Sequence, residues 1–121
     1  VNKYMEAKEL RIGNYGKEIT HSKNGVVKVS KRHFEDIEYG EIDLFPIPLT
    51  GEWFVKFSFE YLAGAEYEKE INNLYFNWDK EQGLIIFIGE SNESIAFEYV
   101  KYVHQLQNLY FAFTNKELTI K

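Results

Sequence analysis

A chain of 121 residues, with 45% apolar and 17% aromatic residues, is long enough to bury its own core and too apolar for a disordered protein. It has no cysteine, which excludes disulfide scaffolds and thiolate metal sites, and its longest uncharged apolar run, LIIFI at 84–88, is too short to span a bilayer. Residues 1–32 hold 8 basic against 3 acidic residues and the rest hold 6 against 16, so most of the chain would repel DNA.

The N-terminal part, residues 1–45, is expected to be a basic, β-rich module that is SH3-like or a small meander. Asn24-Gly25 lies between Ile19 and the apolar run at 26–29. Both residues tolerate the positive φ angles of a tight hairpin turn, so the flanking runs are predicted to be paired strands. The spacing of the glycines matches no phosphate-binding loop, and turn geometry is the ordinary explanation for them.

The middle of the chain should change from extended connector to helix. Pro46 and Pro48 cannot sit inside a helix, so residues 45–49 are predicted to be extended. Thr50 can N-cap a short helix, and Gly64 is expected to end that unit. The apolar residues of this stretch have roughly helical spacing and indicate core: Trp53, Phe54, Phe57 and Leu62.

Residues 67–97 carry the pattern of an antiparallel three-stranded sheet. The runs at 71–78, 83–89 and 94–100 are rich in β-branched and aromatic residues, and the segments DKEQG and ESNE between them suit hairpin connections. One outer strand would present unpaired backbone groups, which is either a protected edge or a docking surface for another strand.

The segment 103–113 predicts an amphipathic helix packed on that sheet, with Asn115 as its C-cap. On a helical wheel the residues of the packed face are Val103, Leu106, Leu109, Tyr110 and Phe113. A second face holds His104, Asn108 and Phe111, and we expect it to be exposed as a partner-binding patch. The whole chain, residues 1–121, is thus predicted to be a single α+β domain, with the helices and the sheet in 46–121.

No catalytic group is expected. His104 has no serine or cysteine at a recognisable nucleophile spacing, and His21 and His33 are far from it in the sequence. We therefore predict a structural or surface histidine, no catalytic residue, no metal site and no cofactor.

The densest acidic stretch is FEDIEYGEID. Such a run is often only a solvated face, and the alternative is an anionic surface aimed at a basic partner. We take the second interpretation as the hypothesis for partner binding. Its residues are Glu35, Asp36, Glu38, Tyr39, Glu41 and Asp43.

Three sequence blocks, KELRIGNY, PIPLTGEWFVKFSFE and YVHQLQNLYFAFTNKELTI, resemble recurring blocks of a family of small proteins from phages, prophages and integrative elements of Bacteroidota. The family pattern reads Thr-Gly-Glu-Glu-Leu where this chain has TNKEL at 114–118, and it has a second Glu in place of Gly51. Both departures concern helix capping. The resemblance implies a mobile-element origin, and accessory proteins of this kind include inhibitors of host defence systems.

The expected function is therefore that of a non-enzymatic protein-binding accessory protein in the cytoplasm of a bacterial host. Its partner would be a host protein such as a basic nuclease of a CRISPR-type defence, with no membrane involved. The alternative is a nucleic-acid-binding protein that uses the basic N-terminal module. An enzyme is the third and least favoured class.

Overall fold

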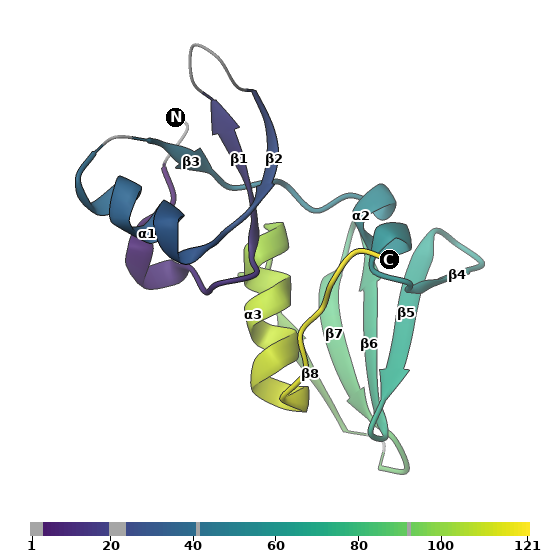
Figure 1. The fold of residues 1–121 in the computed structure, drawn as a ribbon. Helices are drawn as coiled ribbons and strands as arrows, with labels where there is room; N and C mark the ends of the chain where they lie inside the picture. The colour runs from purple at the N-terminus through teal and green to yellow at the C-terminus, as the bar shows by residue number, and fades with distance from the viewer. Residues whose placement is uncertain (1–3, 20–23, 41, 92) are drawn as a thin grey trace. The chain divides into compact units, whose positions relative to one another are not determined.

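A computed structural model describes residues 4–19, 24–40, 42–91 and 93–121 (Figure 1). It confirms the α+β class, with a three-stranded and a five-stranded antiparallel sheet. The chain divides into two compact units. Unit 1 contains residues 1–48 and 102–109, and unit 2 contains residues 49–101 and 110–121. The C-terminal helix α3, Val103–Thr114, contributes its first part to unit 1 and its end to unit 2.

The sheet of unit 1 has the strand order β2-β1-β3. Its strands are β1 (Tyr15–Ile19), β2 (Asn24–Lys28) and β3 (Leu44–Phe45). The prediction that Asn24-Gly25 forms the hairpin turn was wrong. Asn24 pairs with Ile19 and Gly25 pairs with Glu18, so both are strand residues. The connection between the strands consists of residues 20–23, which lie outside the described residues.

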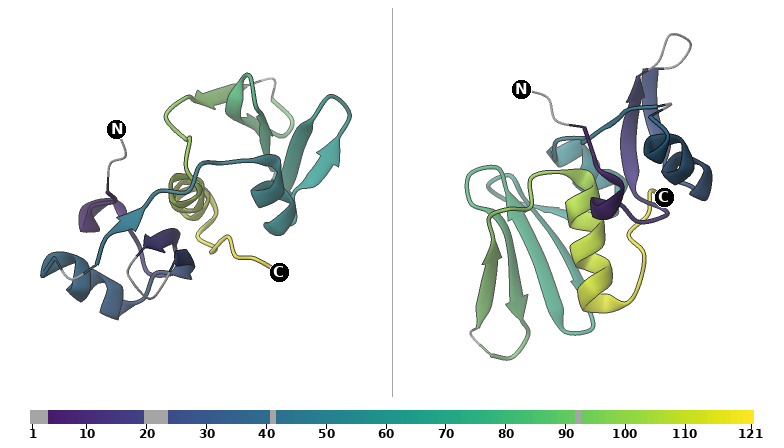
Figure 2. Two further views of the ribbon diagram at one scale, coloured as in Figure 1. Left: turned by 90° about the horizontal axis from the view of Figure 1, so that it is seen from above. Right: turned by 90° about the vertical axis from the view of Figure 1, so that its left-hand side faces the viewer.

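Two helical segments accompany this sheet: the 3₁₀ turn η1 (Ala7–Glu9) and the helix α1 (Lys31–Glu38). The sequence did not predict α1, which lies next to η1 (Figures 1 and 2). It begins after Ser30, whose backbone N–H donates to His33 Nδ1 at 2.9 Å. Phe34 and Ile37 pack against a small buried core, so α1 covers apolar surface of unit 1. That core consists of Met5, Leu10, Val27, Val29 and Leu44.

Unit 2 begins with the helix α2, Gly51–Lys56, which starts after Thr50 as expected. It ends earlier than predicted, because Leu62 belongs to strand β4 (Glu60–Leu62) and Gly64 lies in the turn after it with a φ of +80°. A Cβ atom on Gly51 would overlap the ring of Tyr67. The close approach of that ring therefore explains glycine at the first position of α2.

The sheet of unit 2 has five strands in sequence order, two more than predicted. After β4 come β5 (Glu66–Ile71), β6 (Leu74–Asp79), β7 (Gly83–Ile88) and β8 (Ser94–Phe97). Asn72 and Asn73, which were expected to open a strand, have φ angles of 50° and 65°. They form a two-residue hairpin between β5 and β6, where positive φ at both positions matches the twist of the strands.

Aromatic rings form the core of unit 2. Phe54 is fully buried, stacks on Trp78 with ring centroids 4.5 Å apart and meets Phe59 edge-on at 4.9 Å. The end of α3 joins the sheet through Tyr110, whose ring lies 5.1 Å from that of Phe76. Asn115 follows with a φ of 58° and donates its N–H to Phe111 O at 2.8 Å, which confirms the predicted C-cap.

Candidate functional site

The acidic stretch predicted to bind a partner forms the second half of α1 and the turn after it. Glu35 and Glu38 are exposed on the helix, and Tyr39 is its C-cap residue with 77% of its surface exposed. Asp43 is exposed before β3, whereas Glu41 lies outside the described residues. The structure thus brings several of the predicted residues together. We call this set the acidic α1 surface: Glu35, Asp36, Glu38, Tyr39 and Asp43.

The charges of α1 run against the helix dipole. Lys31 and Arg32 occupy the first turn, where the helix is partially positive, and Glu38 lies in the last turn, where it is partially negative. Arg32 forms an ion pair with Asp36 at 3.8 Å. The basic residue comes four positions before the acidic one, and this order stabilises a helix less than the reverse order. Stability of the helix therefore does not explain the position of these acids.

The second predicted patch, formed by His104, Asn108 and Phe111, is not an exposed face. His104 is only 2% exposed, and Asn108 accepts a hydrogen bond from Asn14 Nδ2 at 2.9 Å and donates one to Glu9 O at 3.1 Å. Phe111 is half-buried and belongs to unit 2, whereas the other two belong to unit 1. The prediction was wrong because His104 is buried and the segment from η1 to β1 binds the side chain of Asn108.

Gln107, which was not predicted to be important, connects α3 to the segment between η1 and β1 through hydrogen bonds. Its Oε1 accepts the Tyr15 N–H at 2.8 Å, and its Nε2 donates to Gly13 O at 3.1 Å. The side chain is fully buried, and its bond to Tyr15 satisfies a backbone N–H that is also buried. An amide directly after the apolar Leu106 was the available signal, and it does not identify its partners.

Unit 1 also contains an open cavity of about 460 Å³. One face of the sheet contributes Lys17 and Ile19 from β1 and Phe45 from β3, and the start of α3 contributes His104 and Gln105. The remaining lining residues are Tyr4, Glu9, Pro46, Pro48 and Tyr102. A cavity of this size lies within the range of small-molecule sites, about 300 to 1,000 Å³.

His104 lines this cavity with its imidazole buried. Neither of its ring nitrogens has a hydrogen-bond partner among the described residues. Its ring stacks on Tyr102, with centroids 6.2 Å apart and planes 18° from parallel. Burial lowers the pKa of His104 below its ordinary value, and the carboxylate of Glu9 acts weakly in the opposite direction. The imidazole is therefore neutral at pH 7.

This lowered pKa predicts a loss of stability in mild acid. Below the unfolded-state pKa of about 6.5 the unfolded chain binds a proton at His104 that the folded chain resists, so stability falls as the pH falls through that value. The variant His104→Phe has no titrating group at this position and therefore lacks this pH dependence. Urea unfolding at pH 7.5 and pH 5 should show a larger loss for the wild-type chain than for the variant. Equal losses would contradict the buried neutral imidazole.

A second acidic surface lies on the sheet of unit 2. Because side chains alternate along a strand, Glu66, Glu68 and Glu70 of β5 share one face, and Glu60 of β4 pairs directly with Glu68. Like charges opposite each other are destabilising in a sheet. Glu70 also raises the pKa of Tyr75, its partner in the register, through a side-chain hydrogen bond.

Comparisons with known proteins give no relative: no family model, curated protein or solved structure matches the chain. In the part of the chain that the structure describes, no three His, Asp or Glu side chains form a group that could hold a metal ion. None of the helices among the described residues has the length and apolar character needed to cross a membrane.

Proposed function

We propose that this protein is a non-enzymatic binding module whose acidic α1 surface occupies a basic surface of a partner protein. The observation that carries the proposal is the gathering of Glu35, Glu38 and the exposed ring of Tyr39 at the end of α1. These acids lie in the second half of α1, where negative charge does not stabilise the helix. Their position is therefore better explained by binding than by folding.

The chemistry of this surface suits a partner rich in arginine and lysine. Carboxylates accept charge-assisted hydrogen bonds from the side chains that otherwise hold phosphates, and a tyrosine supplies contact area at a low entropic cost. The resemblance to proteins of phages and integrative elements suggests where such a partner occurs. A host defence nuclease has a basic surface for its nucleic acid, and a protein that covers this surface would act as an inhibitor.

Nucleic-acid binding by the basic N-terminal part is the alternative with less support. Two of its cations already have acidic neighbours within the chain, because Lys8 lies 3.2 Å from Glu6 and Arg32 lies 3.8 Å from Asp36. Such pairs reduce the positive field that a phosphate backbone would meet.

The double variant Glu35→Lys/Glu38→Lys tests the proposal and leaves the Arg32–Asp36 pair in place. A partner is first captured from bacterial lysate and identified by mass spectrometry, and its association is then measured at low and high salt. At low salt the reversal should slow association by about tenfold or more, and by less at high salt, because opposite charges steer the encounter and salt screens them. The melting temperature should stay the same or rise slightly, since lysine suits a helix C-terminus.

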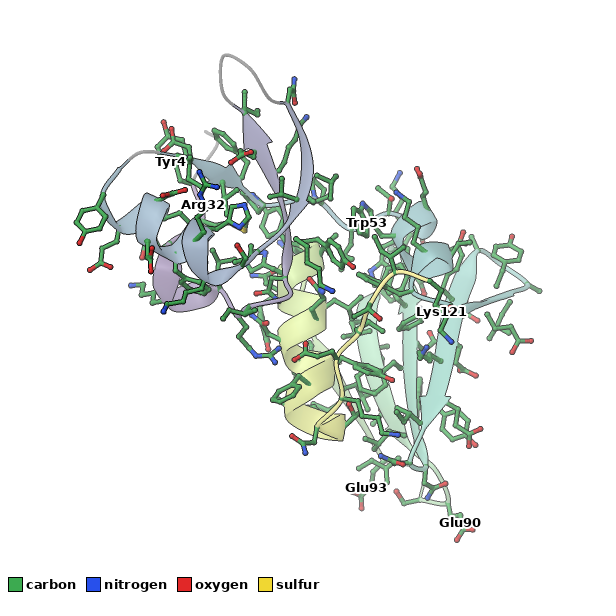
Figure 3. The ribbon with its side chains drawn as sticks, in the orientation of Figure 1. Tyr4, Arg32, Trp53, Glu90, Glu93 and Lys121 are labelled. Carbon is green, nitrogen blue, oxygen red and sulfur yellow. The ribbon has the colours of Figure 1, made fainter. Side chains whose placement is uncertain are left out.

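The control Glu90→Lys/Glu93→Lys makes the same change in net charge on the loop between β7 and β8, where both side chains are exposed (Figure 3). It should bind like the wild-type chain. Equal association rates for both double variants would reject the acidic α1 surface. Capture of nucleic acid instead of a protein, with affinity that falls as salt rises, would favour the alternative.

A further inference from the structure

We propose that the cavity of unit 1 is a ligand site for a flat nitrogen heterocycle carrying an anionic group, the chemistry of a nucleotide. The site is separate from the acidic α1 surface. Its lining residues come from the N-terminal segment, from β1 and β3 with the prolines that follow, and from the start of α3.

The walls of the cavity favour a flat ring. Tyr4 and Phe45 meet edge to face with centroids 5.1 Å apart, and Tyr102 stacks on His104. Pro46 and Pro48 add rigid apolar surface. Aromatic rings bind other rings by stacking or edge contact, and the stacking of bases on aromatic side chains is largely independent of their sequence.

The buried imidazole favours a ring with a hydrogen-bonding edge. A neutral histidine has one N–H donor and one nitrogen acceptor, and both ring nitrogens of His104 are buried without a partner among the described residues. Buried polar groups in folded proteins nearly always have a partner, which is protein, water or ligand. The two nitrogens point in different directions from the imidazole, so an acceptor or an N–H donor on the edge of one heterocycle would satisfy one of them.

The charges at the cavity favour an anionic group on one side of that ring. Lys17 is exposed on β1 and its ammonium can pair with a phosphate or carboxylate. The first turn of α3 lines the same cavity, and the start of a helix is partially positive. Glu9 is the one acidic residue among the lining residues, and its carboxylate suits the amino group of a base such as adenine or cytosine.

The test is an NMR titration of the full chain, labelled at its histidine rings, with the four nucleoside monophosphates. AMP or CMP should shift the ring signals of His104 with saturation at millimolar concentration or below. Adenosine, which lacks the phosphate, should bind about tenfold more weakly, and Lys17→Ala should weaken AMP by a similar factor, the effect of one charge-assisted contact. Lys28→Ala removes the same charge from an exposed β2 residue outside the cavity and should change nothing.

A titration with a short single-stranded oligonucleotide shows whether the ligand is a free nucleotide or part of a nucleic-acid strand. Binding of the oligonucleotide with the same His104 shifts and the same dependence on Lys17 would support the site and identify a nucleic-acid strand as its ligand. Absence of His104 shifts with every probe, or equal effects of the two lysine variants, would overturn the proposal. Neither result depends on a captured protein partner, so the acidic α1 surface is tested independently.

Discussion

Replacing Phe54 by alanine should lower the free energy of unfolding by about 3 to 5 kcal/mol, the usual cost of removing a buried phenyl ring. Phe54 is fully buried and its ring contacts those of Phe59, Tyr67 and Trp78. Its loss would leave a cavity in the centre of the core of unit 2. Urea unfolding followed by tryptophan fluorescence measures the change.

Val55→Ala is the matched control, because Val55 is the next residue of the same helix and is 58% exposed. We expect its effect to stay within about 0.5 kcal/mol, as for most surface substitutions. A similar cost for the two variants would show that the helix, rather than the ring cluster, limits the stability of this unit.

The second large effect is expected at Gln107. Gln107→Ala would leave the Tyr15 N–H and the Gly13 carbonyl without their buried partner, and each such group costs about 1 to 3 kcal/mol, so we expect a total of about 2 to 4 kcal/mol. Gln107→Met keeps nearly the same volume but makes neither hydrogen bond. If methionine restores the stability, the side chain acts by filling space and the hydrogen-bond argument is wrong.

The elements with strong local signals were predictable. The start of α2 follows from Thr50, and α3 with its Asn115 cap follows from helical periodicity. The strands β6 to β8 follow from runs rich in aromatic and β-branched residues. The helix α1 gave no such signal, because its cap uses His33 where a Glu or Gln is typical and its charges oppose the dipole. Strand β5 was not among the predicted strands, because its sequence, EYEKEI, alternates glutamate with only two apolar side chains.

The candidate sites were less predictable than the fold. A helical wheel identifies two faces of α3 but not what covers the second one. That cover depends on hydrogen bonds such as Asn14 to Asn108, which join residues 94 positions apart. The cavity likewise combines β1, β3 and the start of α3, and no local pattern reveals that these segments meet. The acidic α1 surface was predictable as a charge cluster, although the helix that presents it was not.

The division of the chain has a consequence for its synthesis on the ribosome. Residues 49–101 of unit 2 are inserted between the two segments of unit 1, and the ends of the insertion meet where Pro48 pairs with Tyr102 and the Leu49 N–H donates to Lys101 O at 3.0 Å. The strands β4 to β8 pair in the order of their synthesis, which favours early folding. We therefore expect the nascent sheet of unit 2 to form first and to shorten the loop that unit 1 must close. The segment 4–48 of unit 1 is synthesised before unit 2 and would then complete its unit after it.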